Sequence, residues 1–207
     1  MTAAPLKRLG ILLSGRGSNF LAIADQVRAG ILKDVAEIAI VISNVEDAPG
    51  LAAARELGLE TALFVSKGRK RAEHDADVAT CLDAHGVDLV VLAGYMRLLS
   101  PEFIAAFSNR ILNIHPSLLP AFPGLDAQTQ AFNYGCKMAG CTVHFVDEQL
   151  DHGVIVLQRC IAVLDNDDAH SLAERILAEE HIAYSEGIAR VLSGRYCIEG
   201  RRYVPTS

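Results

Sequence analysis

Three polar side chains stand where an α/β protein can use them for chemistry. Asn113 and His115 are two residues apart in the apolar segment 111–115, and Asp151 follows later in the chain. Side chains two apart in a strand point to the same face of the sheet. The prolines after His115 cannot continue a central strand, so the pair is predicted to lie at a strand end. Ligands gather at such ends in open α/β sheets.

These three residues together predict a kind of reaction. An amide and an imidazole that converge on one point can donate hydrogen bonds to a developing oxyanion. The carboxylate of Asp151 can orient the imidazole and favour its charged form. We therefore predict transfer of a carbonyl group by oxyanion stabilisation and proton movement, without a covalent intermediate on the enzyme. His144 and His152, which lie near Asp151 in sequence, are further candidates for polar chemistry, although a structural role is the expectation for both.

Other kinds of catalytic centre lack their sequence patterns. The seven histidines form no H-E-x-x-H motif and no pairing with cysteine at ligand spacing, so no metal site is predicted. Ser117 is not in a G-x-S-x-G context and is not expected to be a nucleophile. The five cysteines are an odd number without a C-x-x-C pair, and we expect them to be buried free thiols.

A glycine-rich segment near the N-terminus has the pattern of an anion site. Residues 14–19 read Ser-Gly-Arg-Gly-Ser-Asn and join a strand-like segment to a helix-like one. This arrangement aims backbone N–H groups and the positive helix end at an anion. Phe20 replaces the third glycine of the dinucleotide fingerprint, and the P-loop motif is missing. A site for one phosphate beside Ser18 and Asn19 is one interpretation, and a turn that only joins strand to helix is the other.

The hydrophobic pattern alternates strands and helices over most of the chain. This alternation predicts an α/β fold with a Rossmann-like, doubly wound, mostly parallel sheet and a C-terminal antiparallel extension. We expect a single domain over residues 1–207, with an N-terminal half at about 1–107 and a C-terminal half at about 108–207. The predicted strands are 6–13, 35–43, 60–65, 87–92, 111–115, 138–145 and 154–163, and the predicted helices are 20–29, 51–57, 69–85, 126–134 and 165–192, with a further helix capped by Ser100 and a hairpin over 196–204.

The composition is that of a folded protein of the cytoplasm. Hydrophobic residues make up 51% of the 207 residues and charged residues 21%, which excludes a disordered chain. Apolar runs fall short of the roughly 20 residues that span a membrane, and residues 1–5 do not form a signal sequence. The net charge of −6 disfavours nucleic acid as a partner. The sequence leaves the oligomeric state open, with a homodimer as one candidate. A single basic cluster suits either a solvated loop or a small anionic ligand, and it contains Lys67, Arg69, Lys70 and Arg71.

Three segments resemble the phosphoribosylglycinamide formyltransferase family. They are Asn-Ile-His-Pro-Ser-Leu-Leu-Pro at 113–120, the glycine-rich segment 14–19, and Val-His-Phe-Val at 143–146 before Asp-His-Gly at 151–153. The resemblance covers essentially the whole chain. The N-x-H pattern and the later aspartate are shared by the wider group of formyltetrahydrofolate-using enzymes, whereas the proline-rich continuation and the glycine-rich segment are typical of the purine enzyme.

The resemblance implies a reaction and roles for the three polar residues. The amine of glycinamide ribonucleotide would attack the formyl carbon of 10-formyltetrahydrofolate, a step of de novo purine biosynthesis. Asn113 and protonated His115 would stabilise the tetrahedral oxyanion, and His115 would act as general acid. Asp151 would hold His115 charged and help to move the proton through water.

The resemblance also implies residues that bind the two small molecules. The nucleotide phosphate would bind at Gly17, Ser18 and Asn19, and its ribose would contact Glu180. Arg71 would meet the folate tail, although a solvated helix residue is the alternative there. Asn113 and the backbone of one loop would contact the pterin, with the segment 147–153 closing over it, and that loop contains Met96, Arg97, Leu98 and Leu99.

Three other functions stay open at this point. A formyltetrahydrofolate hydrolase shares the N-x-H strand but usually carries an additional N-terminal regulatory domain, whereas here a strand is predicted from residue 6. A nicotinamide-dependent oxidoreductase is disfavoured by the missing third glycine. A folate- or nucleotide-binding module without catalysis is disfavoured by the intact Asn113, His115 and Asp151.

Overall fold

The computed structural model of the protein describes residues 5–206. Most of the segment 1–5, for which we expect no signal sequence, lies outside that range. The chain forms two compact units, the first ending at Leu112 and the second beginning at Asn113. Each unit is described by itself.

The first unit is a parallel sheet with helices. Its strands lie in the order β3-β2-β1-β4, and the pairings of β1 with β2, β1 with β4 and β2 with β3 are all parallel. Every residue of β4 is buried, as expected of a continuous apolar strand covered on both faces. The elements in chain order are β1 (Lys7–Leu13), α1 (Ser18–Ala29), β2 (Ala36–Ser43), α2 (Pro49–Glu56), β3 (Thr61–Leu63), α3 (Arg71–Ala84), β4 (Leu89–Leu92) and α4 (Pro101–Ala106).

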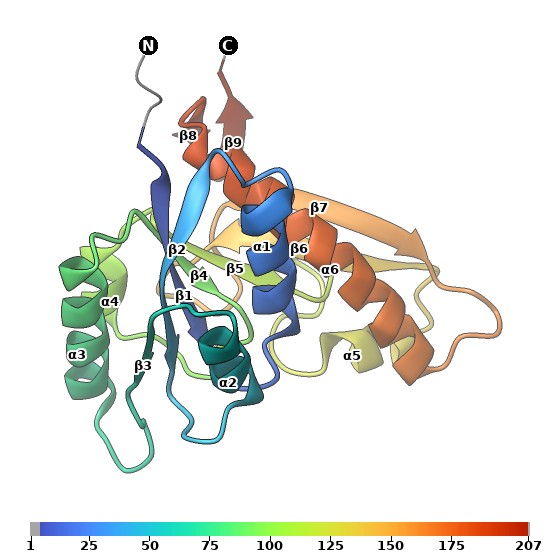
Figure 1. The fold of residues 1–207 in the computed structure, drawn as a ribbon. Coiled ribbons are helices and arrows are strands. Elements are labelled where there is room, and N and C mark those ends of the chain that lie inside the picture. The colour runs from blue at the N-terminus through green and yellow to red at the C-terminus, as the bar shows by residue number, and fades with distance from the viewer. Residues whose placement is uncertain (1–4, 207) are drawn as a thin grey trace. The chain divides into compact units, whose positions relative to one another are not determined.

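The strand order of the first unit reverses beside β1. The chain runs outward from β1 through β2 to β3 and then returns to place β4 on the other side of β1. Because such crossovers are right-handed, the helices before and after the return cover opposite faces of the sheet. Figure 1 shows α1 and α2 on one side of these strands and α3 and α4 on the other. The loops after β1 and β4 therefore meet at a topological switch point, where doubly wound sheets bind ligands.

The second unit is a mixed sheet with one long helix. Strands β6 and β7 pair antiparallel, β7 pairs in parallel with β9, and β9 pairs antiparallel with β8. Helix α6 packs on β6 and β7, where Gly187 lets it approach closely: a Cβ there would lie 2.7 Å from Cγ1 of Val143. The elements are the end of β5 (Ile111–His115), α5 (Ala127–Tyr134), β6 (Met138–Phe145), β7 (Ile155–Ala162), α6 (Ala169–Leu192), β8 (Tyr196–Glu199) and β9 (Arg202–Pro205).

These elements confirm the predicted α/β class with antiparallel strands toward the C-terminus. One boundary is wrong by four residues, because α6 begins at Ala169 and not at residue 165. The side chain of Asp168 accepts from the Ser171 amide and Ser171 Oγ accepts from the Asp168 amide, a reciprocal capping box that sets the helix start. Within residues 5–206, no helix has the length and apolar content needed to span a membrane.

Candidate active site

Four polar side chains of the second unit form one cluster. Asn113 and His115 come from the end of β5, His144 from β6, and Asp151 from the loop between β6 and β7. Asn113 Nδ2 lies 3.2 Å from His144 Nε2, His115 Nδ1 lies 3.4 Å from Asp151 Oδ2, and His144 Nε2 lies 3.8 Å from Asp151 Oδ1. The three residues predicted to carry the chemistry are therefore brought together, and His144 joins them.

His144 holds the amide of Asn113 in one orientation. Its Nδ1 lies 2.8 Å from the carbonyl oxygen of Phe145, which can only accept, so Nδ1 carries the proton. Burial lowers the pKa of His144, partly opposed by that backbone hydrogen bond and by the charge of Asp151. The neutral ring then accepts at Nε2 from Asn113 Nδ2. One N–H of the amide is used in this way, and the second stays available to a ligand.

Both ring nitrogens of His115 face acceptors. Nε2 donates to the carbonyl of Phe122 over 2.8 Å, and Nδ1 faces the carboxylate of Asp151 at 3.4 Å. The side chains of His115 and Asp151 are nearly buried, at 6% and 9% exposed. A carbonyl oxygen only accepts, so Nε2 carries a proton in this geometry. The contact at Nδ1 is longer than a normal hydrogen bond, so this nitrogen is the one left to face a reacting group.

The proline-rich loop after β5 presents the carbonyl that fixes His115. Phe122 has φ of 52°, an unusual conformation for a bulky residue, and its carbonyl accepts from His115 Nε2. Such a strained residue costs about 1–2 kcal/mol and is kept where the surroundings enforce it. The Ser117 hydroxyl donates to the neighbouring carbonyl of Ala121 over 2.6 Å. The Leu119–Pro120 peptide bond in the same loop is cis.

Side chains of β6 and β7 hold the proline-rich loop in place. The first is Thr142 of β6, which is fully buried. Its hydroxyl donates to the carbonyl of Ser117 over 2.7 Å and accepts from the amide of Leu119 over 3.0 Å. Gln158 Nε2 adds hydrogen bonds to the Leu119 carbonyl at 2.9 Å and to Thr142 Oγ1 at 3.0 Å. Thr142 and His144 are two apart on β6 and so lie on one face, where one supports the loop and the other the amide of Asn113.

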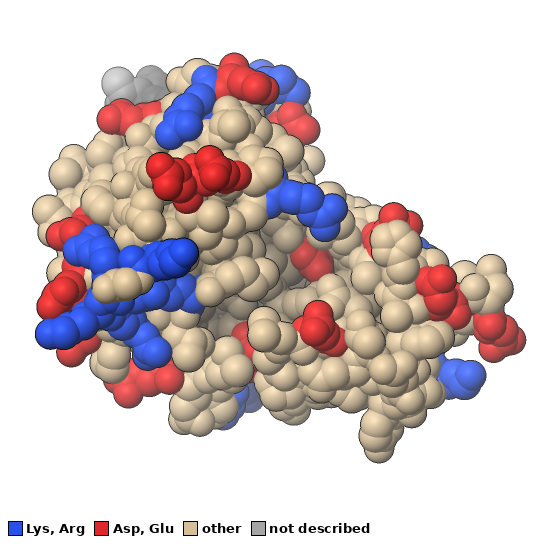
Figure 2. All heavy atoms as spheres, turned by 90° about the horizontal axis from the view of Figure 1, so that it is seen from below, with Lys and Arg blue, Asp and Glu red and all other residues tan. Residues whose placement is uncertain are grey.

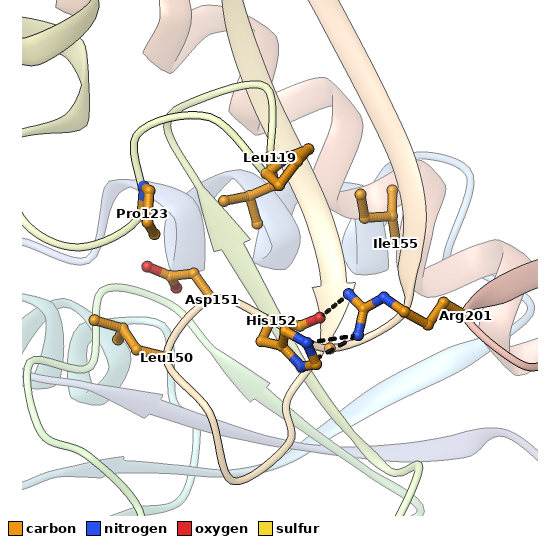
Figure 3. A pocket seen from close by; sticks show the side chains of 9 residues that line it. Leu119, Pro123, Leu150, Asp151, His152, Ile155 and Arg201 are labelled. Atoms are coloured by element: carbon orange, nitrogen blue, oxygen red, sulfur yellow. Dashed lines mark hydrogen bonds between the residues drawn. The ribbon is translucent and has the colours of Figure 1, made fainter.

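Asp151 is held by its own loop and by the proline-rich loop. It has φ of 50°, and its Oδ2 accepts from the amide of Gly124 over 2.8 Å. Two residues later Gly153 lies so close to the carbonyl of Phe145 that a Cβ would be 1.8 Å from that oxygen. A cavity of about 320 Å³ opens beside Asp151 (Figure 3), with Leu119, Pro123, Leu150, Ile155 and Arg201 among its lining residues.

In the first unit, the glycine-rich loop is closely packed at the start of α1. Gly17 has φ of 73° at the N-cap of this helix, and a Cβ there would lie 2.9 Å from Cα of Gly50. The amide of Gly50 in turn donates to the carbonyl of Gly15 over 3.0 Å. Ser18 and Asn19 are the first two residues of α1, at the end of the helix that carries a partial positive charge. This geometry suits a phosphate.

The loop after β4 meets the glycine-rich loop within the same unit. The amide of Met96 donates to Ser14 Oγ over 2.8 Å, and Ser14 N donates to the carbonyl of Gly94 over 3.1 Å. Met96 is 74% exposed and Leu98 55%, whereas Leu99 is buried. Arg97 donates through Nη2 to the Arg69 carbonyl over 3.3 Å, while its buried Nε has no partner. An exposed apolar edge beside an unpaired buried donor suits a flat, partly polar ligand.

Arg71 begins α3 and belongs to the basic cluster predicted from the sequence. Its side chain is exposed, as are those of Lys67 and Lys70, and Arg69 is paired with Asp77 at 2.7 Å. Figure 2 shows lysine and arginine side chains gathered on the side of the molecule where the loop between β3 and α3 lies in Figure 1. Both interpretations, a solvated loop and an anion site, stay open.

Glu180 is a buried carboxylate of α6 in the second unit, with 6% of the residue exposed. Burial, with the charge of Glu180 as the second cause, raises the pKa of the Cys141 thiol to about 12.

The five cysteines are free thiols, as predicted. The expectation that all are buried is wrong: Cys141 alone is buried, Cys160 is exposed, and the other three are intermediate. Cys160 faces outward because β7 has one exposed face and its side chains alternate.

The contact of His144 with Asn113 was not predicted from the sequence, and neither were the roles of Thr142 and Gly50. The alternation of Thr142 and His144 along a strand was a usable signal for the first two residues. Among residues 5–206, no group of three or more His, Cys, Asp or Glu side chains is arranged to hold a metal ion.

Comparison with known proteins identifies relatives of this chain. Residues 7–188 match the family model described as Formyl transferase. The chain is 39% identical over 186 residues to the phosphoribosylglycinamide formyltransferase of Escherichia coli strain K12, covering 89% of this chain and 87% of the relative. It is 42% identical over 189 residues to the trifunctional purine biosynthetic protein adenosine-3 of Drosophila melanogaster, but spans only 14% of that protein.

A solved structure is similar over its full length. The crystal structure of glycinamide ribonucleotide transformylase 1 from Symbiobacterium toebii matches with a TM-score of 0.93 and 47% identity, and the match covers 100% of both chains. The family match over most of the chain and this similarity agree with the Asn113, His115 and Asp151 cluster. The chain therefore belongs to the formyl transferase family.

Proposed function

We propose that the protein transfers the formyl group of 10-formyltetrahydrofolate to the amine of glycinamide ribonucleotide, in the de novo purine biosynthesis of the cytoplasm. The observation that carries the proposal is the meeting of Asn113, His115 and Asp151 in one nearly buried cluster. Membership in the formyl transferase family and the similarity to relatives named for this activity support it.

The cluster acts on the tetrahedral intermediate. As the amine nitrogen forms a bond to the formyl carbon, the carbonyl electron pair moves onto oxygen. The free N–H of Asn113 and the Nδ1–H of His115 donate to this oxyanion, and removing one such donor typically costs about 10²–10³ in rate. Collapse of the intermediate re-forms the carbonyl and breaks the bond to the folate nitrogen. His144 keeps the Asn113 amide turned for this role.

Asp151 and His115 move the proton. The attacking amine loses a proton and the leaving folate nitrogen gains one, so no net proton is consumed. Asp151 stabilises the charged ring of His115, which lets this histidine act as the general acid. The Asp151 carboxylate, through water, takes part in carrying the proton from the amine to the leaving nitrogen.

Four residues bind the nucleotide in this proposal. Gly17, Ser18 and Asn19 bind its phosphate at the N-terminal end of α1, where a side chain in place of Gly17 would clash with Gly50. Glu180 hydrogen-bonds the ribose hydroxyls, a role that suits a buried carboxylate.

The folate binds to the loop after β4 in this proposal. The exposed side chains of Met96 and Leu98 offer an apolar surface to the pterin ring, and the unpaired Nε of Arg97 offers a donor. Buried Leu99 anchors the loop. Arg71 attracts the anionic folate tail, and Asn113 contacts the folate at the formyl group.

The test follows folate absorbance with and without glycinamide ribonucleotide. We expect tetrahydrofolate to form only when the ribonucleotide is present. Equal formation without it, with release of formate, would overturn the proposal in favour of the hydrolase, in which water replaces the amine.

A variant separates catalysis from binding. The His115→Ala protein should bind the folate nearly as well as the unchanged protein while its kcat falls by about 10²–10³. Binding is measured by equilibrium titration with tetrahydrofolate. Loss of binding with unchanged turnover would contradict the role assigned to His115.

A further inference from the structure

The turn between β8 and β9 touches the loop that carries Asp151. Arg201 occupies this turn and, like Asp151 and His152, lines the cavity of the second unit. Its Nη1 lies 2.9 Å from His152 Nε2 and 3.1 Å from His152 Nδ1, and its Nη2 donates to the carbonyl of His152. Figure 3 shows the guanidinium group against the His152 ring and carbonyl. Arg201, which is 49 positions from His152 in sequence, thus contacts both the ring and the backbone carbonyl of this neighbour of Asp151.

The hydrogen-bond directions make this contact specific. His152 Nδ1 lies 2.8 Å from Asp147 Oδ2, and a carboxylate only accepts, so Nδ1 carries the proton. A guanidinium group only donates, so Nε2 of the neutral ring accepts from Arg201. Asp147, His152 and Arg201 therefore form a hydrogen-bonded series that joins both ends of the β6–β7 loop to the C-terminal hairpin.

Asp151 depends on the shape of this loop. Its backbone has φ of 50°, which a non-glycine residue adopts at a cost. Gly153 fixes the following chain against Phe145, and the Gly124 amide binds the carboxylate. Those contacts act on Asp151 and on the residue after His152, whereas Arg201 and Asp147 hold His152 itself. Without Arg201, the strained turn at Asp151 loses the contacts that join it to the C-terminal hairpin.

We infer that Arg201 is a positioning residue for the reaction: by clamping His152, it keeps the Asp151 carboxylate aligned with His115. The inference rests on the proposed function for its kinetic consequence. It assigns a role in catalysis to the C-terminal hairpin, which lies outside the family match at residues 7–188. Exposed contacts of this kind contribute little to global stability, so the effect should appear in kcat. Misplacement of a catalytic group by a fraction of an ångström is enough to slow turnover by about tenfold.

The experiment compares Arg201→Ala, Arg201→Lys and the control Arg202→Ala. Arg202 is exposed on the same hairpin and begins β9. We expect Arg201→Ala to lower kcat by about tenfold with unchanged KM for the ribonucleotide. Arg201→Lys keeps one donor and should lie between the alanine variant and the unchanged protein, and Arg202→Ala should match the unchanged protein.

Amide hydrogen exchange over residues 146–153 gives a readout that does not need the reaction. Exchange there should be faster in Arg201→Ala and unchanged in Arg202→Ala. Unchanged exchange in Arg201→Ala would overturn the clamp, and faster exchange with unchanged kcat would overturn the positioning role. A raised KM with unchanged kcat would show direct ligand binding and contradict the inference. If the unchanged protein transfers no formyl group, the proposed function fails, while the exchange result still decides whether the clamp exists.

A double-mutant cycle with His152→Ala adds a second test. If the two side chains act through each other, the double variant should lose less kcat than the product of the single losses. Fully multiplicative losses would contradict the coupling.

Discussion

The side-chain amide of Asn113 donates to Nε2 of His144 over 3.2 Å, and this contact orients the donor that we propose for oxyanion stabilisation. The ring of His144 is fixed in turn by its hydrogen bond to the carbonyl of Phe145. The orientation of Asn113 on β5 thus depends on a neutral histidine of β6.

This contact predicts an indirect effect on turnover. Asn113→Ala removes the donor itself and should lower kcat by about 10²–10³. His144→Ala leaves the amide in place but free to rotate, so kcat should fall by about tenfold, with little change in KM. Steady-state kinetics of the two variants shows whether the loss of kcat is larger for Asn113→Ala than for His144→Ala. A His144→Ala protein with unchanged kcat would show that Asn113 needs no partner.

The burial of His144 predicts a dependence of stability on pH. Burial lowers the pKa of His144 in the folded protein, so the unfolded chain binds more protons once the pH falls below the ordinary histidine value of about 6.5. The unfolding free energy should therefore decrease as the pH falls from about 7.5 toward about 5, and His144→Gln should flatten this decrease. Urea unfolding of the unchanged protein and of the His144→Gln variant, at several pH values between about 7.5 and about 5, measures the unfolding free energy of each. An equal slope in both would contradict the assignment of His144 as a buried neutral group.

The sequence predicted the strand that carries the site better than the contacts that orient it. Asn113 and His115 follow from a period of two and from the prolines that end the strand, both of which are local signals. The pairing of Asn113 with His144 depends on which strands become neighbours, and the pairing of His152 with Arg201 joins positions 49 apart. Likewise, helix α6 begins at Ala169 because Asp168 and Ser171 cap each other. The apolar periodicity alone places the start of this helix four residues too early, at residue 165.

The hydroxyl of Thr142 predicts a difference between two conservative variants. Thr142→Val leaves the buried Leu119 amide without this acceptor and should lower the unfolding free energy by about 1–3 kcal/mol. Thr142→Ser keeps the hydroxyl and loses one methyl group, so its loss should be near about 1 kcal/mol. Urea unfolding at constant pH compares them. A valine variant as stable as the serine variant would show that the proline-rich loop does not need this hydroxyl.

The cysteines predict a pattern of chemical labelling. The buried Cys141 thiol, with its pKa raised to about 12, has a thiolate fraction of about 10⁻⁴ at pH 8 and no access to solvent. Cys160 is exposed and should react first with a thiol reagent in the native protein. Mass spectrometry of digested, labelled protein identifies the sites. Labelling of Cys141 as fast as Cys160 would contradict the packing of β6 under α6.

The fate of the formyl carbon tests the central claim most directly. With carbon-13 in the formyl group of 10-formyltetrahydrofolate, nuclear magnetic resonance follows that carbon during turnover by the unchanged protein. We predict that the label moves into the formyl amide of formylglycinamide ribonucleotide, and that it stays on the folate when the ribonucleotide is left out. Label that appears as free formate, at the same rate with and without the ribonucleotide, would contradict transfer to an amine at the Asn113, His115 and Asp151 cluster.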